Sequence, residues 1–396
     1  MRILHTSDWH LGRSFHREGL LDAQAAFVDH LLQTIADERV DLVLVSGDVY
    51  DRALPPVDAV ELADETFARL AGSRARVVVT SGNHDSQIRL GFNSRLADVA
   101  GIHFRTRWQD VGTPVLLEDD HGPVAVHGLP YLEPDAVRGP WGLPTRTHEA
   151  ALTAAMERVH ADLDARAGIR SIVMAHAFVA GSADAAPAMA SDSERDISVG
   201  GVQIAPTSLF SRVDYAALGH LHGPQTLSET IRYSGSPLAY SFSEARHTKG
   251  SWLVELGPGG VERTDFVPAP VPRRLATLRG RLDDLLADPA HQEVEEAWLQ
   301  VTLTDPQRPL HAMDRVRTRF PHVLILAFEP DGVARERGPV MPHVDGRSDL
   351  DVALGFVAEV RSLEATTEET LLLQLACDSC RINEDADRPI RIEQAG

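Results

Sequence analysis

Lysine is almost absent from this sequence of 396 residues. Arginine accounts for 37 of the 38 basic residues, and the single lysine is Lys249. We attribute this bias to GC-rich coding rather than to function, because 37 arginines cannot all read a ligand through bidentate contacts. The 58 acidic residues give a formal net charge of −20. This balance argues against a broad basic surface for nucleic acid, so any such surface must be local or belong to a partner.

Cysteine is equally scarce, with only Cys377 and Cys380 in the whole sequence. Two cysteines cannot build a disulfide framework, which is typical of a reducing compartment. Their C-x-x-C spacing supplies half of the four ligands of a zinc site and could be completed only across a dimer, so plain thiols are expected. No run of about 18 apolar residues and no signal-like leader occurs, and we expect a cytoplasmic protein.

The first 270 residues alternate short β-branched runs with stretches of helical periodicity, which predicts an α/β layered domain. Helices are predicted over 20–38, 57–71 and 147–167. The predicted strands are 3–6, 42–46, 77–80, 124–126, 172–175, 216–218, 231–233 and 252–255. A segment rich in Ala, Ser and Asp, 181–196, is predicted to be a surface loop near the substrate channel.

A proline-rich joint at 267–272 marks the end of this first domain, which we place at 1–270. A small α+β module is predicted at 273–330, with strands at 275–278, 298–303 and 323–327 and helices at 282–286 and 312–320. A linker, 331–347, and a C-terminal helical tail, 348–396, follow. The apolar faces within 350–375 serve either a partner or a local core.

Polar side chains follow the predicted strands in a fixed order, D-x-H, G-D, G-N-H-D, H and G-H-x-H. The residues are Asp8, His10, Asp48, Asn83, His84, Asp85, His176, His220 and His222. Oxygen and imidazole donors without thiolate suit Mn²⁺, Fe²⁺ or Zn²⁺. A single His or Gly-Asp at a strand end is usually only a polar turn residue. Five such motifs in one order, each after an apolar run, instead predict a metal site.

Seven of these residues are too many ligands for one metal ion and fit two ions that share a carboxylate. Asp8, His10, Asp48 and His222 are predicted to hold the first ion. Asp48, Asn83, His176 and His220 are predicted to hold the second, so that Asp48 bridges the pair. Such a pair can clamp the charge that develops at phosphorus. His84 is a candidate catalytic acid for the leaving alkoxide, and Asp85 is expected to orient it.

This ordered set resembles the calcineurin-like metallophosphoesterase family. The resemblance narrows to the SbcD-type bacterial nucleases through the stretches 5–12, 47–51, 82–86, 128–131, 191–195, 217–222 and 233–242. It implies a two-sheet β-sandwich flanked by helices, with a capping domain at 273–330 and a C-terminal helical tail. It also implies two Mn²⁺ ions, 3′-to-5′ exonuclease activity on duplex DNA and endonuclease activity on single strands and hairpins. The implied partners are an SbcC-type ABC ATPase, bound through the tail, and a second copy of the chain.

Two other functions remain open at this point. The same two-metal chemistry would serve a phosphodiesterase for cyclic nucleotides or other small molecules, although the capping module and the tail argue against it. A catalytically dead scaffold for an ATPase is disfavoured by the complete ligand set. The net charge predicts weak DNA binding by this chain alone, with DNA retention depending on local arginines and the partner.

Overall fold

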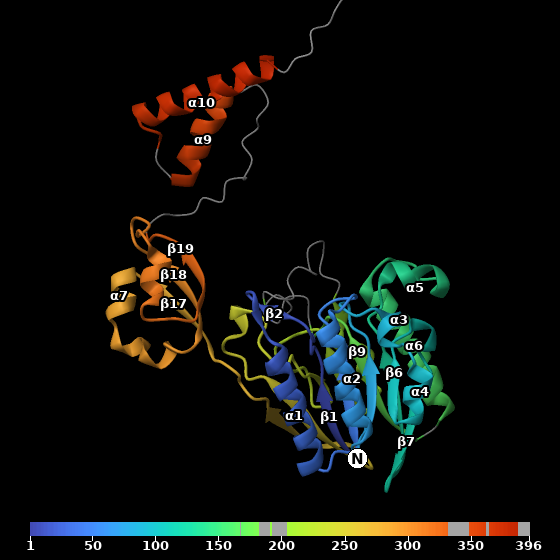
Figure 1. The fold of residues 1–396 in the computed structure, drawn as a ribbon. Coiled ribbons are helices and arrows are strands. Elements are labelled where there is room, and N and C mark those ends of the chain that lie inside the picture. The colour runs from blue at the N-terminus through green and yellow to red at the C-terminus, as the bar shows by residue number, and fades with distance from the viewer. Residues whose placement is uncertain (167, 182–190, 192–203, 332–347, 362–363, 387–396) are drawn as a thin grey trace, which may run out of the picture. The chain divides into compact units, whose positions relative to one another are not determined.

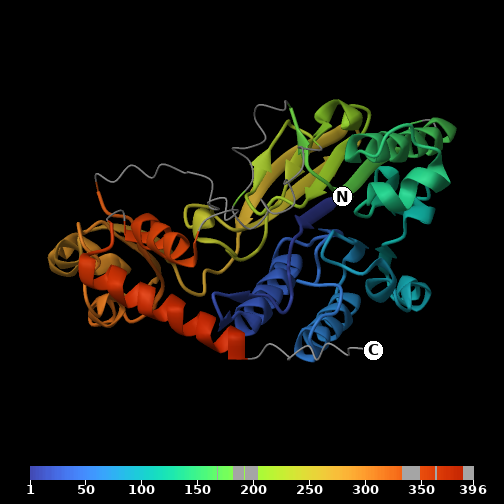
Figure 2. The same ribbon diagram turned by 90° about the horizontal axis from the view of Figure 1, so that it is seen from above.

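The protein is described here from a computed structural model, drawn in Figures 1 and 2. The structure describes residues 1–166, 168–181, 191, 204–331, 348–361 and 364–386. The predicted linker beyond residue 331, and the predicted 181–196 loop apart from residues 181 and 191, lie outside these ranges. The chain forms two compact units, Met1–Asp331 and Gly332–Gly396, which are taken separately below.

Two six-stranded sheets form the centre of the first unit (Figure 1). The first sheet has the order β16 (Gly260–Pro268), β15 (Gly250–Gly257), β1 (Arg2–Thr6), β4 (Leu42–Ser46), β5 (Arg76–Thr80) and β6 (Ile102–Arg105). The second has the order β13 (Gln225–Thr226), β14 (Ile231–Tyr233), β12 (Tyr215–Gly219), β9 (Arg170–His176), β8 (Gly122–Leu129) and β7 (Val115–Asp119). Within each sheet the central strands are parallel.

Side chains alternate across the first sheet as the two-residue strand period requires. Ile3 packs between the two sheets against Met174 and Tyr215, whereas Leu4 packs on the outer face. Helices α1 (Leu21–Asp37) and α2 (Val57–Ala71) cover that outer face. The outer face of the second sheet is covered by α5 (Pro134–Trp141) and α6 (His148–Ala165). The resulting order of helix, sheet, sheet and helix confirms the expected α/β fold, a two-sheet sandwich flanked by helices on both sides.

Short elements connect these layers. Two small helices, α3 (Gln87–Leu90) and α4 (Ser94–Val99), follow β5. A hairpin joins β2 (Ser14–Phe15) to β3 (Glu18–Gly19), and β10 (Val179–Ala180) pairs with β11 (Ala205–Pro206). The hairpin residue Phe15 stacks on Trp298 of the small module, with ring centroids 5.5 Å apart. The module therefore contacts the sandwich through an apolar cluster.

The small module is a three-stranded parallel sheet with two helices and its own apolar core. Its elements are β17 (Leu275–Gly280), α7 (Leu282–Ala287), β18 (Trp298–Leu303), α8 (Ala312–Arg317) and β19 (Val323–Phe328). This order of strand, helix, strand, helix and strand is the predicted one. The joint before it starts inside β16, because Val267 and Pro268 still pair with Ser251 and Gly250.

The second unit contains α9 (Asp349–Arg361) and α10 (Thr367–Ala386), which contact each other. Both helices confirm the predicted helical tail. Among the described residues, no helix has both the length and the apolar character needed to cross a bilayer.

A buried polar contact joins the two sheets close to their polar edge. Nε2 of His5 lies 3.1 Å from the carbonyl oxygen of Leu218, and Nδ1 lies 2.9 Å from the hydroxyl of Tyr215. The carbonyl can only accept, so Nε2 donates and Nδ1 accepts from the tyrosine. Burial lowers the pKa of His5 from 6.5 to about 3. His5 is therefore neutral in the folded protein at neutral and mildly acidic pH.

Between pH 6.5 and about 3 the unfolded chain binds a proton at His5 that the folded chain does not. The free energy of unfolding should therefore fall on acidification, by up to about 1.4 kcal/mol per pH unit from this residue. We expect the fall to be shallower in His5→Gln and unchanged in His121→Gln, which alters an exposed histidine. Urea unfolding in EDTA at several pH values measures this fall in the free energy of unfolding for each protein. Equal slopes in wild type and His5→Gln would contradict this account.

Candidate metal centre

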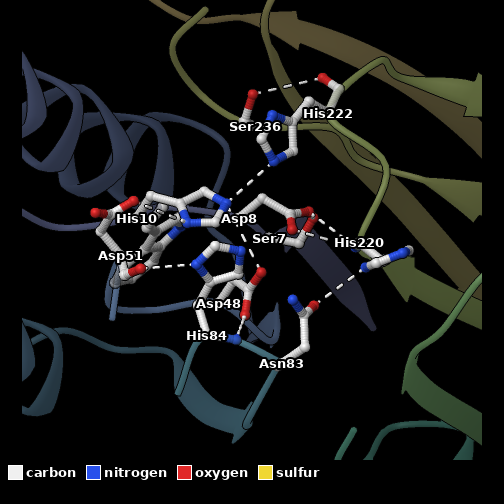
Figure 3. A network of polar contacts seen from close by, with 12 residues as sticks. Ser7, Asp8, His10, Asp48, Asp51, Asn83, His84, His220, His222 and Ser236 are labelled. Carbon is white, nitrogen blue, oxygen red and sulfur yellow. Dashed lines mark hydrogen bonds and ion pairs between the residues drawn. The ribbon is translucent and has the colours of Figure 1, made fainter. Parts of the chain in front are cut away.

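The predicted site residues come from the carboxyl ends of parallel strands in both sheets. Asp8 and His10 follow β1, Asp48 follows β4, and Asn83 follows β5. In the second sheet His176 ends β9, and His220 and His222 follow β12. Because the carboxyl ends of parallel strands lie at one edge, the fold brings residues that are distant in sequence to one place. Figure 3 shows the side chains converging there, with Asp8, His10, Asp48, Asn83, His220 and His222 labelled.

Four of these residues have a left-handed backbone that non-glycine residues rarely adopt. The φ angles are 54° at Asp8, 47° at His10, 50° at Asp48 and 108° at His220. Each such conformation costs of order 1–3 kcal/mol and persists only where the surroundings impose it. Main-chain bonds from Asp8 N to Gly47 O and from His10 N to Asp48 O, both 3.0 Å, fix the two loops of the first sheet.

Two glycines allow these loops to approach each other closely. A Cβ atom on Gly82 would overlap the carboxylate of Asp48, and one on Gly219 would overlap the carbonyl of Ser46. Any side chain at these positions would push the loops of the site apart. The glycines of the G-N-H-D and G-H-x-H motifs are thus required by packing.

The first set of donors surrounds a pair of histidine nitrogens. Nε2 of His10 lies 3.1 Å from Nε2 of His222, and 3.7 Å from Oδ2 of Asp48. Asp8, His10 and His222 each offer one ligand atom within 4.8 Å of the others. All four residues are buried. Two imidazoles and two carboxylates converging in this way form a donor set that a divalent cation fits.

The second set lies on the other side of Asp48. Oδ1 of Asn83 is 3.0 Å from Nε2 of His176 and 3.2 Å from Nδ1 of His220. The other ring nitrogen of His176, Nδ1, donates to the carbonyl of Ser46 at 2.9 Å. This bond leaves Nε2 facing the carboxylate of Asp48, whose Oδ2 lies 3.3 Å away. Of this set, Asp48 and His176 lie with Asp8 in one group whose ligand atoms are within 4.8 Å of one another.

The charges of the site are closely linked. Burial alone would raise the pKa of Asp48, but His176 beside it lowers that pKa well below its usual range. Burial would lower the pKa of His176, yet Asp48 and Asp8 raise it to about 9. Burial and His176 lower the pKa of His220 to about 3. Without a metal ion, Asp48 and His176 thus form the ion pair of the site.

His84 lies at the half-buried rim of the site, next to both donor sets. Its main-chain N–H donates to Oδ1 of Asp48 at 2.9 Å, and its ring meets the ring of His10 edge-on at 4.7 Å. Its Nδ1 donates to the carbonyl of Asp51 at 2.7 Å, which leaves Nε2 available. The geometry also allows His84 to share a cation with His10 and Asp48.

The expectation that Asp85 orients His84 is wrong, because the Asp51 carbonyl holds the ring of His84. The carboxylate of Asp85 instead accepts three main-chain N–H groups, from Val49 at 3.1 Å, Tyr50 at 2.9 Å and Gly82 at 2.9 Å. Burial and the nearby charge of Asp48 raise the pKa of Asp85 to about 7. Asp85 therefore ties the loop that carries Asp48 to the loop that carries Asn83.

Sequence reasoning assigned no role to several residues that support the site. Ser7 donates to Oδ2 of Asp8 at 2.5 Å, and Oε1 of Glu244 lies 3.3 Å from Nδ1 of His222. Glu244 pairs with Lys249 at 2.6 Å. Ser7 lies in the stretch 5–12 that carries the family resemblance, whereas for Lys249 the rarity of lysine is the one signal in the sequence.

Two family models match this chain. The calcineurin-like phosphoesterase model matches residues 1–224, more than half of the chain and all seven predicted metal ligands. The model SbcD_C, described as the type 5 capsule protein repressor C-terminal domain, matches residues 271–361. The second match covers the small module and α9.

Solved structures are similar at low sequence identity. The protein TT1561 of Thermus thermophilus is 16% identical with a TM-score of 0.40, covering 67% of this chain and 98% of that chain. A novel archaeal phosphodiesterase is 10% identical with a TM-score of 0.30, covering 67% of this chain and 100% of that chain. Because both TM-scores are low, the assignment to a family depends on the family models.

The position of Asp85 predicts how its removal will act. In Asp85→Ala three main-chain N–H groups lose their acceptor, so we expect the free energy of unfolding to fall by about 1–3 kcal/mol. Metal binding should weaken with it, because the loops of Asp48 and Asn83 are released from each other. Thermal unfolding in EDTA and metal content after dialysis measure both effects, with the exposed Asp22→Ala as control. A variant with normal stability and metal content that fails only in turnover would instead support a role through His84.

Proposed function

This chain belongs to the calcineurin-like phosphoesterase family, and we propose that within it the protein is a DNA nuclease of the SbcD type. Membership makes it a metal-dependent hydrolase of phosphate esters. The choice of DNA as substrate is our proposal, and the observation that carries it is the SbcD_C match over 271–361 behind the phosphoesterase domain. We propose 3′-to-5′ shortening of duplex ends and cleavage of single strands and hairpins.

The proposed cofactor is a pair of Mn²⁺ ions. Asp8, His10, Asp48 and His222 would hold the first ion, and Asp48, Asn83, His176 and His220 the second. Support comes from Oδ2 of Asp48, which faces both His10 and His176, at 3.7 and 3.3 Å. A mixed set of carboxylate, amide and imidazole ligands without thiolate suits Mn²⁺. When bound, the two ions attract the phosphodiester and acidify the attacking water.

His84 is the proposed general acid. Because its Nδ1 proton is bound by the Asp51 carbonyl, its Nε2 is the atom that can give a proton to the leaving alkoxide or bond a phosphoryl oxygen. Half-burial at the rim leaves this nitrogen within reach of a substrate. An imidazole is suited to the task because its ring nitrogen can either give or take a proton.

An SbcC-type ABC ATPase is the proposed partner, with the tail helices as its binding site. Phe356 on α9 and Leu371, Leu372 and Leu375 on α10 are large apolar side chains that are 59–65% exposed. Exposed apolar groups in such numbers are typical of an interaction surface. The net charge of −20 supports the same division of labour, in which this chain cuts DNA and the partner holds it.

A second copy of the chain is proposed to cover an apolar patch near α2, α3 and α4. The patch consists of Leu54, Val57, Ile88, Phe92, Leu96 and Val99, which are 67–87% exposed. Its two parts adjoin, since Arg89 on α3 donates to the carbonyl of Ala53 at 3.1 Å. A symmetric dimer places the same patch of each copy against the other, which removes both from water.

Charge at the centre of this patch should separate the copies. We expect sedimentation to give a dimer for the wild type and a monomer for Phe92→Glu, since a carboxylate would be buried without a partner. Leu116→Glu, which alters an exposed apolar residue on β7, is the control and should stay dimeric. A wild-type monomer at micromolar concentration, or a dimeric Phe92→Glu variant, would contradict the proposed interface.

One assay tests the proposed activity. The purified chain is offered end-labelled duplex DNA, hairpin DNA and a small phosphodiester, with Mn²⁺, Mg²⁺ or EDTA, with and without the ATPase. We expect Mn²⁺-dependent degradation of DNA, and a loss of about 10²- to 10⁴-fold in turnover for His84→Ala with its Mn²⁺ content unchanged.

Three outcomes would contradict the proposal in different ways. Degradation that survives EDTA would exclude the metal mechanism. Turnover of the small phosphodiester with no cleavage of DNA, even with the ATPase, would favour a small-molecule phosphodiesterase. Loss of Mn²⁺ from His84→Ala would make His84 a ligand.

A further inference from the structure

The only lysine of the chain is buried directly behind a predicted metal ligand. Lys249 precedes β15 and is 6% exposed. Its ammonium group donates to Oε2 of Glu244 at 2.6 Å, to the carbonyl of His222 at 2.7 Å and to the hydroxyl of Ser236 at 3.0 Å. These three acceptors use all three N–H groups of the ammonium. The buried cation is therefore fully paired.

Glu244 connects this lysine to the ring of His222. Its side chain is buried, and Oε1 lies 3.3 Å from Nδ1 of His222 and 3.1 Å from the hydroxyl of Ser191. The other oxygen, Oε2, accepts from the main-chain N–H of Tyr240 at 3.1 Å in addition to Lys249. His222 is thus held twice, at its main-chain carbonyl by Lys249 and at its ring by Glu244.

The contact with Glu244 also selects one tautomer of His222. An ionised carboxylate can only accept a hydrogen bond, so Nδ1 of His222 carries the proton and donates the bond to Glu244. Nε2 of His222 therefore keeps its lone pair. Nε2 is the atom that faces His10, at 3.1 Å, inside the first donor set. Carboxylates that bind the second nitrogen of a ligating histidine fix the orientation of the ring and increase its basicity.

The identity of the cation at this position is informative because arginine fills the other 37 basic positions. A compact ammonium can point three protons at three separate acceptors, whereas a guanidinium is a wide planar fork. The three separate acceptors of Lys249 therefore favour lysine at a position where the coding bias favours arginine.

We propose that Glu244 and Lys249 are positioning residues that hold His222 in the orientation and tautomer required to bind the first metal ion. The inference rests on the metal site proposed above and deepens it. The pair acts on the first donor set, because Glu244 faces the ring of His222 and Lys249 binds its main-chain carbonyl. Loss of the Glu244–Lys249 pair should therefore weaken the binding of the first ion and leave the binding of the second unchanged.

Mn²⁺ titration followed by the electron paramagnetic resonance of free Mn²⁺ tests this on the full chain. The variants are Glu244→Gln, Lys249→Arg and the double variant Glu244→Gln/Lys249→Met, which removes both charges together and avoids leaving one buried unpaired. Arg246→Met, which removes an exposed charge from the same loop, is the control. Thermal unfolding in EDTA reports whether each variant is folded.

We expect the wild type and the control to bind two Mn²⁺ ions, and each folded variant to bind one of the two about 10- to 100-fold more weakly. The second ion should keep its wild-type affinity. If the folded double variant binds both Mn²⁺ ions with wild-type affinity, this inference is overturned while the proposed function stands. Equal weakening of both sites would also overturn it, by indicating a general disturbance. A wild type that binds no Mn²⁺ would overturn the proposed function together with this inference.

Discussion

The carboxylate of Asp48 is the contact on which the site is built. Oδ2 faces His10 and His176, and Oδ1 accepts the main-chain N–H of His84. It is buried, so its charge must be balanced by a cation or a protonated histidine. The rest of the site is arranged around that requirement. The two donor sets lie on either side of it, and His84 lies at the rim.

Holding this carboxylate in place uses much of the local structure. The loop that carries it has a left-handed residue at Asp48 itself, and glycines at positions 47 and 82 let neighbouring loops approach. Asp85 ties that loop to the next one through three main-chain bonds. Glu244 and Lys249 hold His222, which follows a strand of the other sheet, and the bond between His5 and Tyr215 joins the two sheets beneath the site. Rigid support of this kind keeps the donors near a geometry that metal ions accept.

Much of this fold could be predicted because its central strands are buried on both faces and appear as continuous apolar runs. Strands β6, β7 and β16 were not predicted. They lie at the edges of the two sheets, and β16 in particular carries three charged residues and is mostly half-buried. The residues of the two donor sets were predictable since each ends or follows a buried strand. The partner of His84 was not, because a main-chain carbonyl such as that of Asp51 has no signature in sequence. Nor could spacing show that Glu244 reaches back 22 residues to His222.

The central claim, that Asp48 joins two metal ions, can be tested directly by the electron paramagnetic resonance of bound Mn²⁺. Two ions that share a carboxylate at about 3.5–4 Å are magnetically coupled. The account predicts a coupled spectrum when the wild type holds two equivalents of Mn²⁺, and its loss in Asp48→Asn. Two bound but uncoupled ions in the wild type, or a coupled spectrum that persists in Asp48→Asn, would contradict it.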